Sequence, residues 1–330
     1  MARNRAGAGL GFVGGWSRHV SHGERMPRMP RMQPLARTRR VLWARNGHAC
    51  RMIVSLASGE EARQAAAERA AIRNGDSDSV VVVTGASRGL GLAFVQQLAS
   101  RFKGKIVAGC RSPVDAPALN ALWQFNPLRL TIEALDVTEE ASVQRFAERV
   151  REFGNGRVDV LINCAGLLHD QQNGVMPERS LSALDPQIME LNFRVNAVGP
   201  ALMSKHISPM MVTTRKQGRV FSVIANLSAR VGSIGDNGLG GWHSYRMSKA
   251  AQNQLTRTAS HELGKRGIVV IAMHPGTCDT DLSMPFQRNV KPEKLFAPDF
   301  AVTQLLDLID ALEASDNGHF FAYDRTPIVW

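Results

Sequence analysis

The chain has 330 residues, of which 44% are hydrophobic and 21% are charged, and it carries a formal net charge of +11 at pH 7. The hydrophobic share is enough to bury a sizeable core, which excludes a disordered chain. No stretch approaches the ~18 consecutive apolar residues that cross a bilayer, so the composition also argues against stable membrane insertion.

The positive charge is concentrated in residues 1–51. This segment holds eleven arginines, no lysine and one acidic side chain, whereas the rest of the chain is nearly neutral and gives no support to a nucleic-acid partner. An Arg-rich, acid-poor segment broken by Gly and Pro is typical of an organellar transit peptide. We therefore predict that residues 1–52 direct the protein to the matrix of a mitochondrion or plastid. Two alternatives are a disordered basic arm on a cytoplasmic protein and an extension ahead of a start at Met52.

Residues 53–78 are expected to link this arm to the fold. Within them, the stretch 58–73 begins at a serine, continues with two glutamates and is then rich in alanine, which predicts a short charged helix. From residue 79 onward, apolar runs alternate with segments of helical spacing. The runs predict strands over residues 80–84, 105–110, 130–137, 158–163, 219–226 and 268–274.

The predicted helices follow these strands in turn. They begin after residue 89, near residue 143 and at about residue 185, and two more cover residues 245–263 and 299–312. In the helix from residue 185, the stripe that we expect to face the core is formed by Ile188, Leu191, Val195, Val198 and Leu202. The alternating order predicts an α/β fold, with one Rossmann-type, doubly wound parallel sheet in a single domain over residues 79–330.

A glycine-rich turn follows the first predicted strand. The sequence TGASRGLG places three glycines between a buried strand and an amphipathic helix, although an ordinary tight turn would need only one of them. Such a turn lets the backbone approach a pyrophosphate, which the N–H groups at the start of the helix then bind. The predicted dinucleotide site is formed by Gly85, Ser87, Arg88, Gly89, Leu90 and Gly91.

The end of the second predicted strand indicates which dinucleotide binds. A carboxylate at this point receives the ribose 2′-hydroxyl of NAD, whereas a cation accommodates the 2′-phosphate of NADP. Here Arg111 follows the strand and no acidic residue stands beside it, while Arg88 lies in the glycine-rich turn. The two arginines favour NADP(H), with NAD(H) as the alternative.

Tyr245 and Lys249 stand four residues apart near the start of a predicted helix. This spacing places the phenol and the ammonium on one face of the helix, ~5–6 Å apart. A neighbouring cation brings the pKa of a phenol down toward the working pH. The pair is therefore suited to protonate a carbonyl oxygen while a nicotinamide delivers a hydride to the carbon.

Six motifs together resemble one family. The motifs TGASRGLG, LDVT, NCAG, VNAVGP, YRMSK and HPGTCDT occur in the order and spacing of the classical short-chain dehydrogenases/reductases, over about residues 79–325. The stretch SARVGSIGDNGLGGWHSYRMSKAAQN is similar to the C-factor and Sniffer-like carbonyl reductase branch. The resemblance implies an NAD(P)-dependent oxidoreductase that acts on CH–OH or C=O groups, and we expect a homodimer or homotetramer.

The resemblance also implies roles for single residues. Tyr245 is the acid–base residue, Lys249 lowers its pKa and holds the nicotinamide ribose, and Asn196 holds a water molecule in a proton relay. The remaining residues implied to bind the cofactor are Asp136 at the adenine, Asn163 and Ala165 at its ribose, Gly166 beside them, and Pro275, Gly276 and Thr280 at the nicotinamide.

One position departs from the family pattern. The family's catalytic serine is often the second serine of S-S-x-x-G, and here that position is Ala229. We predict that Ser233 binds the carbonyl oxygen instead, with Ser228 as the second choice. A site without either hydroxyl has lost an oxyanion donor, which motivates an alternative function as a cofactor-binding signalling or scaffold protein with little turnover.

Two segments are expected to surround the substrate. The insertion over residues 234–243 contains four glycines and Trp242, and the apolar segment over residues 283–300 is interpreted as a mobile lid, with an ordinary surface loop as the alternative. Both favour an apolar or aromatic substrate. The expected reaction is therefore reduction of an aldehyde, ketone or quinone, with Tyr245 as the proton donor. No metal is expected, because the histidines and cysteines lack metal-ligand spacing.

Overall fold

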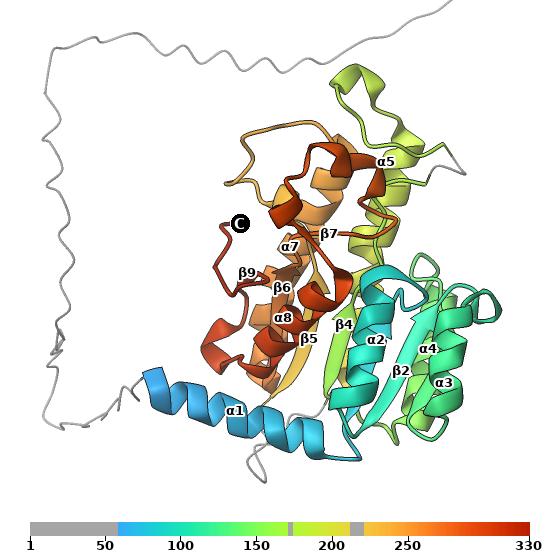
Figure 1. Cartoon of the computed structure of the whole chain (residues 1–330), viewed down its shortest axis with the longest axis vertical. Coiled ribbons are helices and arrows are strands. Elements are labelled where there is room, and N and C mark those ends of the chain that lie inside the picture. The colour runs from blue at the N-terminus through green and yellow to red at the C-terminus, as the bar shows by residue number, and fades with distance from the viewer. Residues whose placement is uncertain (1–58, 171–173, 212–220) are drawn as a thin grey trace, which may run out of the picture. The chain divides into compact units, whose positions relative to one another are not determined.

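The computed structural model describes residues 59–170, 174–211 and 221–330. The basic arm and its predicted targeting role lie outside the described residues. Within them, one parallel sheet has the strand order β3-β2-β1-β4-β5-β6-β9 (Figure 1). Its strands are β1 (Val80–Thr84), β2 (Lys105–Cys110), β3 (Leu130–Ala134), β4 (Val160–Asn163), β5 (Ser222–Leu227), β6 (Ile268–His274) and β9 (Phe320–Ala322).

The strand order places a switch point between β1 and β4. The chain moves outward from β1 through β2 to β3, and then returns to the other side of β1 at β4. In open parallel sheets of this kind, ligands bind at the carboxyl ends of the strands beside the switch point. The predicted doubly wound parallel sheet is confirmed.

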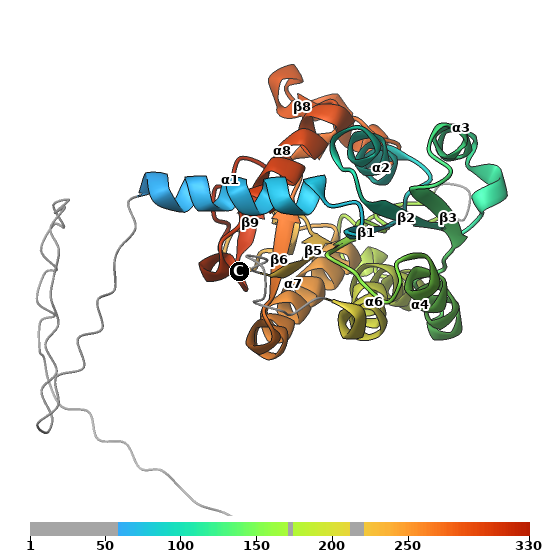
Figure 2. The same cartoon turned by 90° about the horizontal axis from the view of Figure 1, so that it is seen from below.

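Helices cover both faces of the sheet (Figure 2). One face carries α2 (Gly89–Arg101), α3 (Pro117–Phe125) and α8 (Pro298–Asp310), and the other carries α4 (Glu140–Phe153), α6 (Gly199–Ile207) and α7 (His243–Leu263). Every residue of β1, β4 and β5 is buried. Strands covered on both faces need apolar side chains in both directions, which explains their unbroken apolar runs.

The observed strands follow the predicted ranges closely at β1, β2 and β6. β3 ends earlier than predicted, because Asp136 begins a turn in which its carboxylate accepts hydrogen bonds from the backbone and hydroxyl of Thr138 (2.9 and 2.7 Å). The first residues of the predicted fifth strand, 219 and 220, lie outside the described residues. Three strands were not predicted, because each is too short to show a period: β9, β7 (Thr277–Cys278) and β8 (Leu295–Phe296).

The helix predicted from residue 185 consists of consecutive pieces, namely α5 (Pro186–Phe193), a π-helical turn over Arg194–Val198, and α6. The predicted stripe was wrong at Leu191 and Val198, whose side chains are 36% and 44% exposed. The buried face instead contains Asn192 and Asn196. Both asparagines donate hydrogen bonds inside the protein, which makes their burial tolerable and hides this face from a search for apolar residues.

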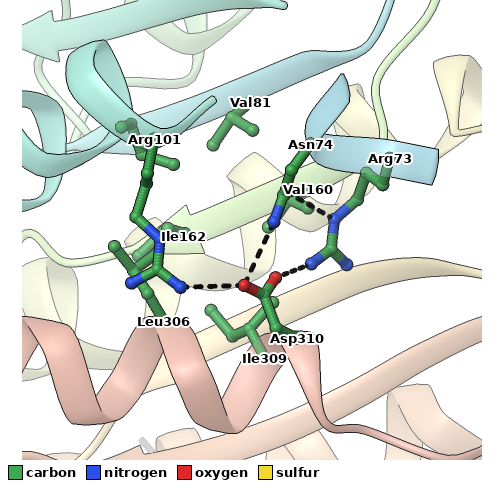
Figure 3. A pocket seen from close by; sticks show the side chains of 10 residues that line it. Arg73, Asn74, Val81, Arg101, Val160, Ile162, Leu306, Ile309 and Asp310 are labelled. Carbon is green, nitrogen blue, oxygen red and sulfur yellow. Dashed lines mark hydrogen bonds and ion pairs between the residues drawn. The ribbon is translucent and has the colours of Figure 1, made fainter. Parts of the chain in front are cut away.

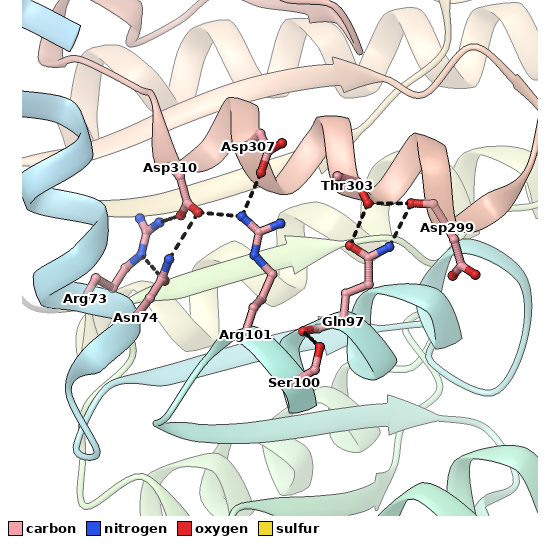
Figure 4. A network of polar contacts seen from close by, with 9 residues as sticks. All are labelled: Arg73, Asn74, Gln97, Ser100, Arg101, Asp299, Thr303, Asp307 and Asp310. Carbon is pink, nitrogen blue, oxygen red and sulfur yellow. Dashed lines mark hydrogen bonds and ion pairs between the residues drawn. The ribbon is translucent and has the colours of Figure 1, made fainter. Parts of the chain in front are cut away.

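α1 (Gly59–Gly75) packs against α8 through a polar cluster at the amino ends of β1 and β2 (Figure 4). Asp310 of α8 accepts hydrogen bonds from Asn74 (3.1 Å) and Arg101 (2.9 Å) and pairs with Arg73. We call these four residues the α1–α8 clasp. A cavity of about 10 Å³ beside it, with room for about one water molecule, is too small for a ligand (Figure 3).

Candidate active site

The glycine-rich turn between β1 and α2 brings backbone segments into close contact. Gly85 has a φ of +68°, and a Cβ atom on it would lie 2.8 Å from the Cα atom of Ala165. A Cβ atom on Gly91 would lie 2.1 Å from the carbonyl oxygen of Gly85. Only glycine is tolerated at both positions. The start of α2 is thereby held against the ends of β1 and β4.

This corner fits the phosphates and ribose of a dinucleotide. The side chain of Arg88, the N-cap residue of α2, makes no capping hydrogen bond, which leaves the first helical N–H groups to bind an anion. The Thr84 hydroxyl accepts hydrogen bonds from the backbone of Cys164 (3.0 Å) and Ala165 (3.1 Å) and fixes the end of β4 beside β1. The Oδ1 atom of Asn163 is buried without a partner in the described chain, as expected where a ligand or water completes the site.

Arg88 and Arg111 lie beyond neighbouring strand ends. The backbone N–H of Ala86 donates a hydrogen bond to the carbonyl of Gly109 (3.0 Å). Arg88 stands two residues after Ala86 and Arg111 two residues after Gly109, so the two arginines extend from neighbouring parts of the backbone. The Arg88 side chain is 73% exposed and forms an ion pair with Asp281 (3.4 Å), and Arg111 is exposed. Both guanidinium groups are accessible to an anion at this corner.

The loop after β6 returns to the glycine-rich turn. It contains the predicted nicotinamide-binding residues Pro275, Gly276 and Thr280. A Cβ atom on Gly89 would lie 3.6 Å from the methyl carbon of Thr280, so the two loops are in contact range. Gly276, with a φ of +78°, packs against the ring of Phe296. The residues predicted for the two ends of the cofactor therefore border one region.

Tyr245 and Lys249 are buried near the start of α7. The Lys249 Nζ atom lies 5.9 Å from the centre of the Tyr245 ring, and it donates hydrogen bonds to the carbonyl of Leu227 (2.8 Å) and the Oε1 atom of Gln252 (3.0 Å). Burial lowers the pKa of Lys249 to about 8 and raises the pKa of the Tyr245 phenol. The predicted lowering of the Tyr245 pKa by Lys249 was therefore wrong, because burial outweighs the effect of the neighbouring cation. At neutral pH this combination is an ammonium beside a protonated phenol.

Asn196 lies in the π-helical turn behind Lys249. Its Oδ1 atom accepts a hydrogen bond from the backbone N–H of Leu167 (2.8 Å), and its Nδ2 atom donates to the Leu167 carbonyl (2.8 Å) and the Ser248 hydroxyl (3.0 Å). A Cβ atom on Gly166 would lie 3.5 Å from Asn196 Oδ1 and 3.8 Å from Lys249 Nζ. The fold thus brings Asn196, Gly166 and Lys249 together.

The two candidate serines flank Ala229 and are buried. The Ser233 hydroxyl donates a hydrogen bond to the carbonyl of Val329 (2.5 Å) and accepts one from the backbone of Asp236 (3.1 Å). The Ser228 hydroxyl donates to Asn253 Oδ1 (2.6 Å). Each hydroxyl proton is therefore used within the protein, and either serine must exchange its partner before it binds a carbonyl oxygen.

An aromatic cluster stands beside Tyr245. Trp242 is in the left-handed backbone region, with a φ of +54°, and its ring centre lies 6.3 Å from that of Tyr245 and 4.9 Å from that of Phe286. The centre of the His169 ring lies 5.7 Å from that of Phe286. The insertion and the predicted lid are therefore in direct contact at the site.

Two residues near the pair were not predicted. Glu178 is buried, and its carboxylate accepts hydrogen bonds from the backbone (3.1 Å) and hydroxyl of Ser244 at the start of α7. Gln252 is also buried, one turn beyond Lys249. A lone glutamate in a loop and a glutamine in a helix carry no motif, so only the folded arrangement identifies them.

The sequence profile of the short chain dehydrogenases matches residues 79–291. The chain belongs to the short-chain dehydrogenase family. The resemblance drawn from the motifs is thereby confirmed, and this short-chain dehydrogenase is an oxidoreductase.

Curated relatives match the body of this short-chain dehydrogenase. The 1-hydroxy-2-glutathionyl-2-methyl-3-butene dehydrogenase of Rhodococcus sp. (strain AD45) is 31% identical over 76% of this chain and 100% of its own length. The C-signal protein of Myxococcus xanthus is 36% identical over 53% of this chain and 94% of its own length.

Solved structures share the fold. A carbonyl reductase from chicken fatty liver, in its NADPH-bound form, has a TM-score of 0.68 and 32% identity, over 76% of this chain and 98% of that one. The carbonyl reductase Sniffer of D. melanogaster has a TM-score of 0.69 and 25% identity, over 77% of this chain and 100% of that one. With the C-signal match, these structures confirm the similarity to the C-factor and Sniffer-like branch. Across the described ranges, no helix has the length and apolar character needed to span a bilayer.

Proposed function

We propose that this short-chain dehydrogenase reduces an aldehyde, ketone or quinone with NADPH. The observation that carries the proposal is the buried Tyr245–Lys249 pair, whose lysine contacts the end of β5, the strand next to β4 at the glycine-rich corner. A carbonyl between this pair and a nicotinamide has a proton donor at its oxygen and a hydride donor at its carbon. The solved carbonyl reductases of similar fold support this reaction type.

Arg88 and Arg111 support NADP(H) over NAD(H). A 2′-phosphate at the end of β2 would meet two accessible guanidinium groups and no carboxylate from the first residues after that strand. Arg88 would exchange its exposed partner Asp281 for the phosphate, at little expense because exposed ion pairs are weak. The NADPH-bound chicken reductase is consistent with this preference.

The chain's own residues control the proton. When bound, NADPH supplies the hydride that reduces the carbonyl carbon. Tyr245 donates its phenolic proton to the carbonyl oxygen, so that the C=O bond becomes CH–OH, and the Lys249 ammonium stabilises the phenolate that remains. Gly166 lies between Asn196 and Lys249, and a proton from water would pass along this side to restore the phenol.

The carbonyl oxygen has one fewer donor than the family pattern provides. Ala229 has no hydroxyl, and the hydroxyls of Ser228 and Ser233 are bonded elsewhere. Loss of one oxyanion donor costs about 3–4 kcal/mol in other enzymes. We therefore expect slow turnover, with substrates that have an electron-poor carbonyl, such as quinones, reduced fastest.

The proposal is tested by following NADPH absorbance with a panel of aldehydes, ketones and quinones, in parallel with NADH. We expect turnover that is faster with NADPH, and faster with aromatic substrates because the Trp242–Phe286 pair stands beside Tyr245. Turnover with NADH alone would contradict the cofactor assignment.

A second function is favoured by two observations: the hydroxyls of Ser228 and Ser233 are hydrogen-bonded within the protein, and the C-signal protein is a relative. In that case the chain would bind NADP(H) in order to signal or to act as a scaffold. Tight NADPH binding with no turnover over the whole panel would support this second function and argue against carbonyl reduction.

A further inference from the structure

We propose that Gln252 is a positioning residue for the proton transfer: its side-chain oxygen holds the Lys249 ammonium against the end of β5 in the charged form that Tyr245 requires. The inference rests on the proposed function, because it concerns the same proton. It concerns a residue outside the tyrosine–lysine motif, one helical turn further along α7.

The contacts of Lys249 define this role. Its Nζ atom has two hydrogen-bond acceptors, the carbonyl of Leu227 at 2.8 Å and the Oε1 atom of Gln252 at 3.0 Å. An ammonium has three N–H donors, so one remains for the cofactor and phenol side. The Leu227 carbonyl belongs to the backbone and survives any substitution. Gln252 is therefore the side chain that orients the ammonium, from one turn further along α7.

The rest of Gln252 indicates that its oxygen is the functional atom. The side chain is 0% exposed, and its Nε2 atom is buried without a hydrogen-bond partner in the described chain. An unpaired buried N–H group costs free energy that an apolar side chain would avoid. Packing therefore gives no reason for an amide at this position, whereas the bond to Lys249 does.

Gln252 also belongs to a buried polar chain that reaches the cofactor corner. Thr256 donates a hydrogen bond to the backbone carbonyl of Gln252 (2.9 Å) and accepts one from Asn226 (2.9 Å), which in turn accepts one from Asn163 (2.8 Å). All four residues are buried. The backbone of α7 at Gln252, from which the side chain reaches Lys249, is thus tied to the strand end that carries Asn163.

No carboxylate among the described residues acts on Lys249. The titratable groups around it are the Tyr245 phenol on its own helix and the Cys164 thiol from the loop after β4, which the Cys278 thiol of β7 faces in turn. On the packed turn after β5, Arg230 pairs with Asp236. Burial has already lowered the pKa of Lys249 to about 8, and Cys164 acts to raise it. In the absence of a carboxylate among the described residues, the oxygens of Leu227 and Gln252 are the hydrogen-bond acceptors that favour the ammonium over the neutral amine.

The test uses two substitutions with opposite expected effects in the full chain. Gln252→Met removes the acceptor at similar size, and Gln252→Glu replaces it with a carboxylate. The pH at which kcat/KM for carbonyl reduction falls on the alkaline side should be about one unit lower in the methionine variant than in the native protein. In the glutamate variant it should be about one unit higher. Gln254→Met, on the exposed side of α7, is the matched control and should match the native profile.

A second readout does not need turnover. The protein is prepared with ε-¹³C lysine, and the Lys249 resonance, assigned with Lys249→Met, is titrated by NMR in the presence and absence of NADPH. Shifts of opposite sign in the two Gln252 variants support the proposal, even if the native protein reduces none of the carbonyls and the proposed function fails. An unchanged Lys249 titration, or shifts of the same sign, would overturn it. Circular dichroism shows whether each variant is folded. Because glutamate has nearly the same shape as glutamine, the glutamate variant still tests the proposal if the methionine variant does not fold.

Discussion

Among single residues, Lys249 is a buried cation that has exchanged most of its hydration for contacts within the protein. The carbonyl of Leu227 and the amide of Gln252 replace part of that hydration, and the ring of Tyr245 lies 5.9 Å away. Burial acts in opposite directions on the two groups, since it lowers the pKa of the lysine to about 8 and raises the pKa of the phenol. The state that the proposed carbonyl reduction requires, with charged lysine and neutral tyrosine, is therefore the state of neutral and mildly acidic solution.

This gives a direct pH prediction. Below pH 8 both groups have the protonation that reduction needs, and as the pH rises through about 8 the lysine loses its proton. The value of kcat/KM for reduction should therefore be level between about pH 6 and 7 and fall through about pH 8. Initial rates over this range check it. A rate that rises through pH 8 would contradict these protonation states.

Ser233 provides the next residue-scale prediction. Its hydroxyl bonds the carbonyl of Val329 and the backbone of Asp236, which ties the loop after β5 to the last residues of the chain. Ser233→Ala should lower the free energy of unfolding by about 1 kcal/mol, because these hydrogen bonds are lost. It should change kcat less than about three-fold.

Steady-state kinetics and urea unfolding measure both quantities, with Ser228→Ala as the companion variant. A fall in kcat of a hundred-fold or more in one variant alone would identify that serine as the oxyanion donor.

At the scale of elements, α1 is held to the fold by the α1–α8 clasp. Asp310 is the shared acceptor of three donors from α1 and α2, and its side chain is mostly buried (Figure 4). Removal of Asp310 would leave the mostly buried guanidinium of Arg73 without its carboxylate, whereas Arg101 would keep its ion pair with Asp307.

Asp310→Ala should therefore lower the free energy of unfolding by about 2–3 kcal/mol. Asp307→Ala, which removes a more exposed partner of Arg101, should lower it by less than about 1 kcal/mol. Urea unfolding compares them. Because the clasp lies at the amino ends of the strands, kcat should be unchanged in both, and equal destabilisation by the two variants would argue against this account.

The elements also show what a sequence can reveal. Runs such as VVVVT at β1 and KIVAGC at β2 are unbroken because both faces are covered, so their limits were predictable. The buried face of α5 and its π-helical turn was not, because it contains Asn192 and Asn196 in place of apolar residues. Motifs likewise located Tyr245, Lys249 and the glycines, whereas Glu178 reaches Ser244 across 66 residues, a contact that no local pattern encodes.

At the scale of the whole molecule, the charge divides into two parts. The basic arm accounts for almost all of the net +11, and its targeting role stays a prediction that cellular localisation of the full chain and of a chain starting at Met52 would check. In the nearly neutral body, Arg88 and Arg111 stand beside the predicted cofactor corner. Their proposed partner is a single phosphate group.

The variant with both Arg88→Ala and Arg111→Ala should raise the KM for NADPH by about ten-fold to a hundred-fold, because two charge-assisted contacts are lost. The KM for NADH, which lacks the phosphate, should change little. Arg149→Ala on α4 removes an exposed arginine away from this corner and serves as the control. Equal changes for NADPH and NADH would show that the arginines do not recognise the phosphate.

In the proposed reaction, Tyr245 delivers the proton during NADPH-dependent carbonyl reduction. The measurement that tests it most directly is single-turnover oxidation of bound NADPH in Tyr245→Phe and in the native protein, each at a carbonyl concentration that saturates the native enzyme. We expect that Tyr245→Phe still binds NADPH but oxidises it at least a hundred-fold more slowly, since general acid catalysis contributes about 10²–10⁴ in rate. Oxidation at the native rate by the phenylalanine variant would contradict it.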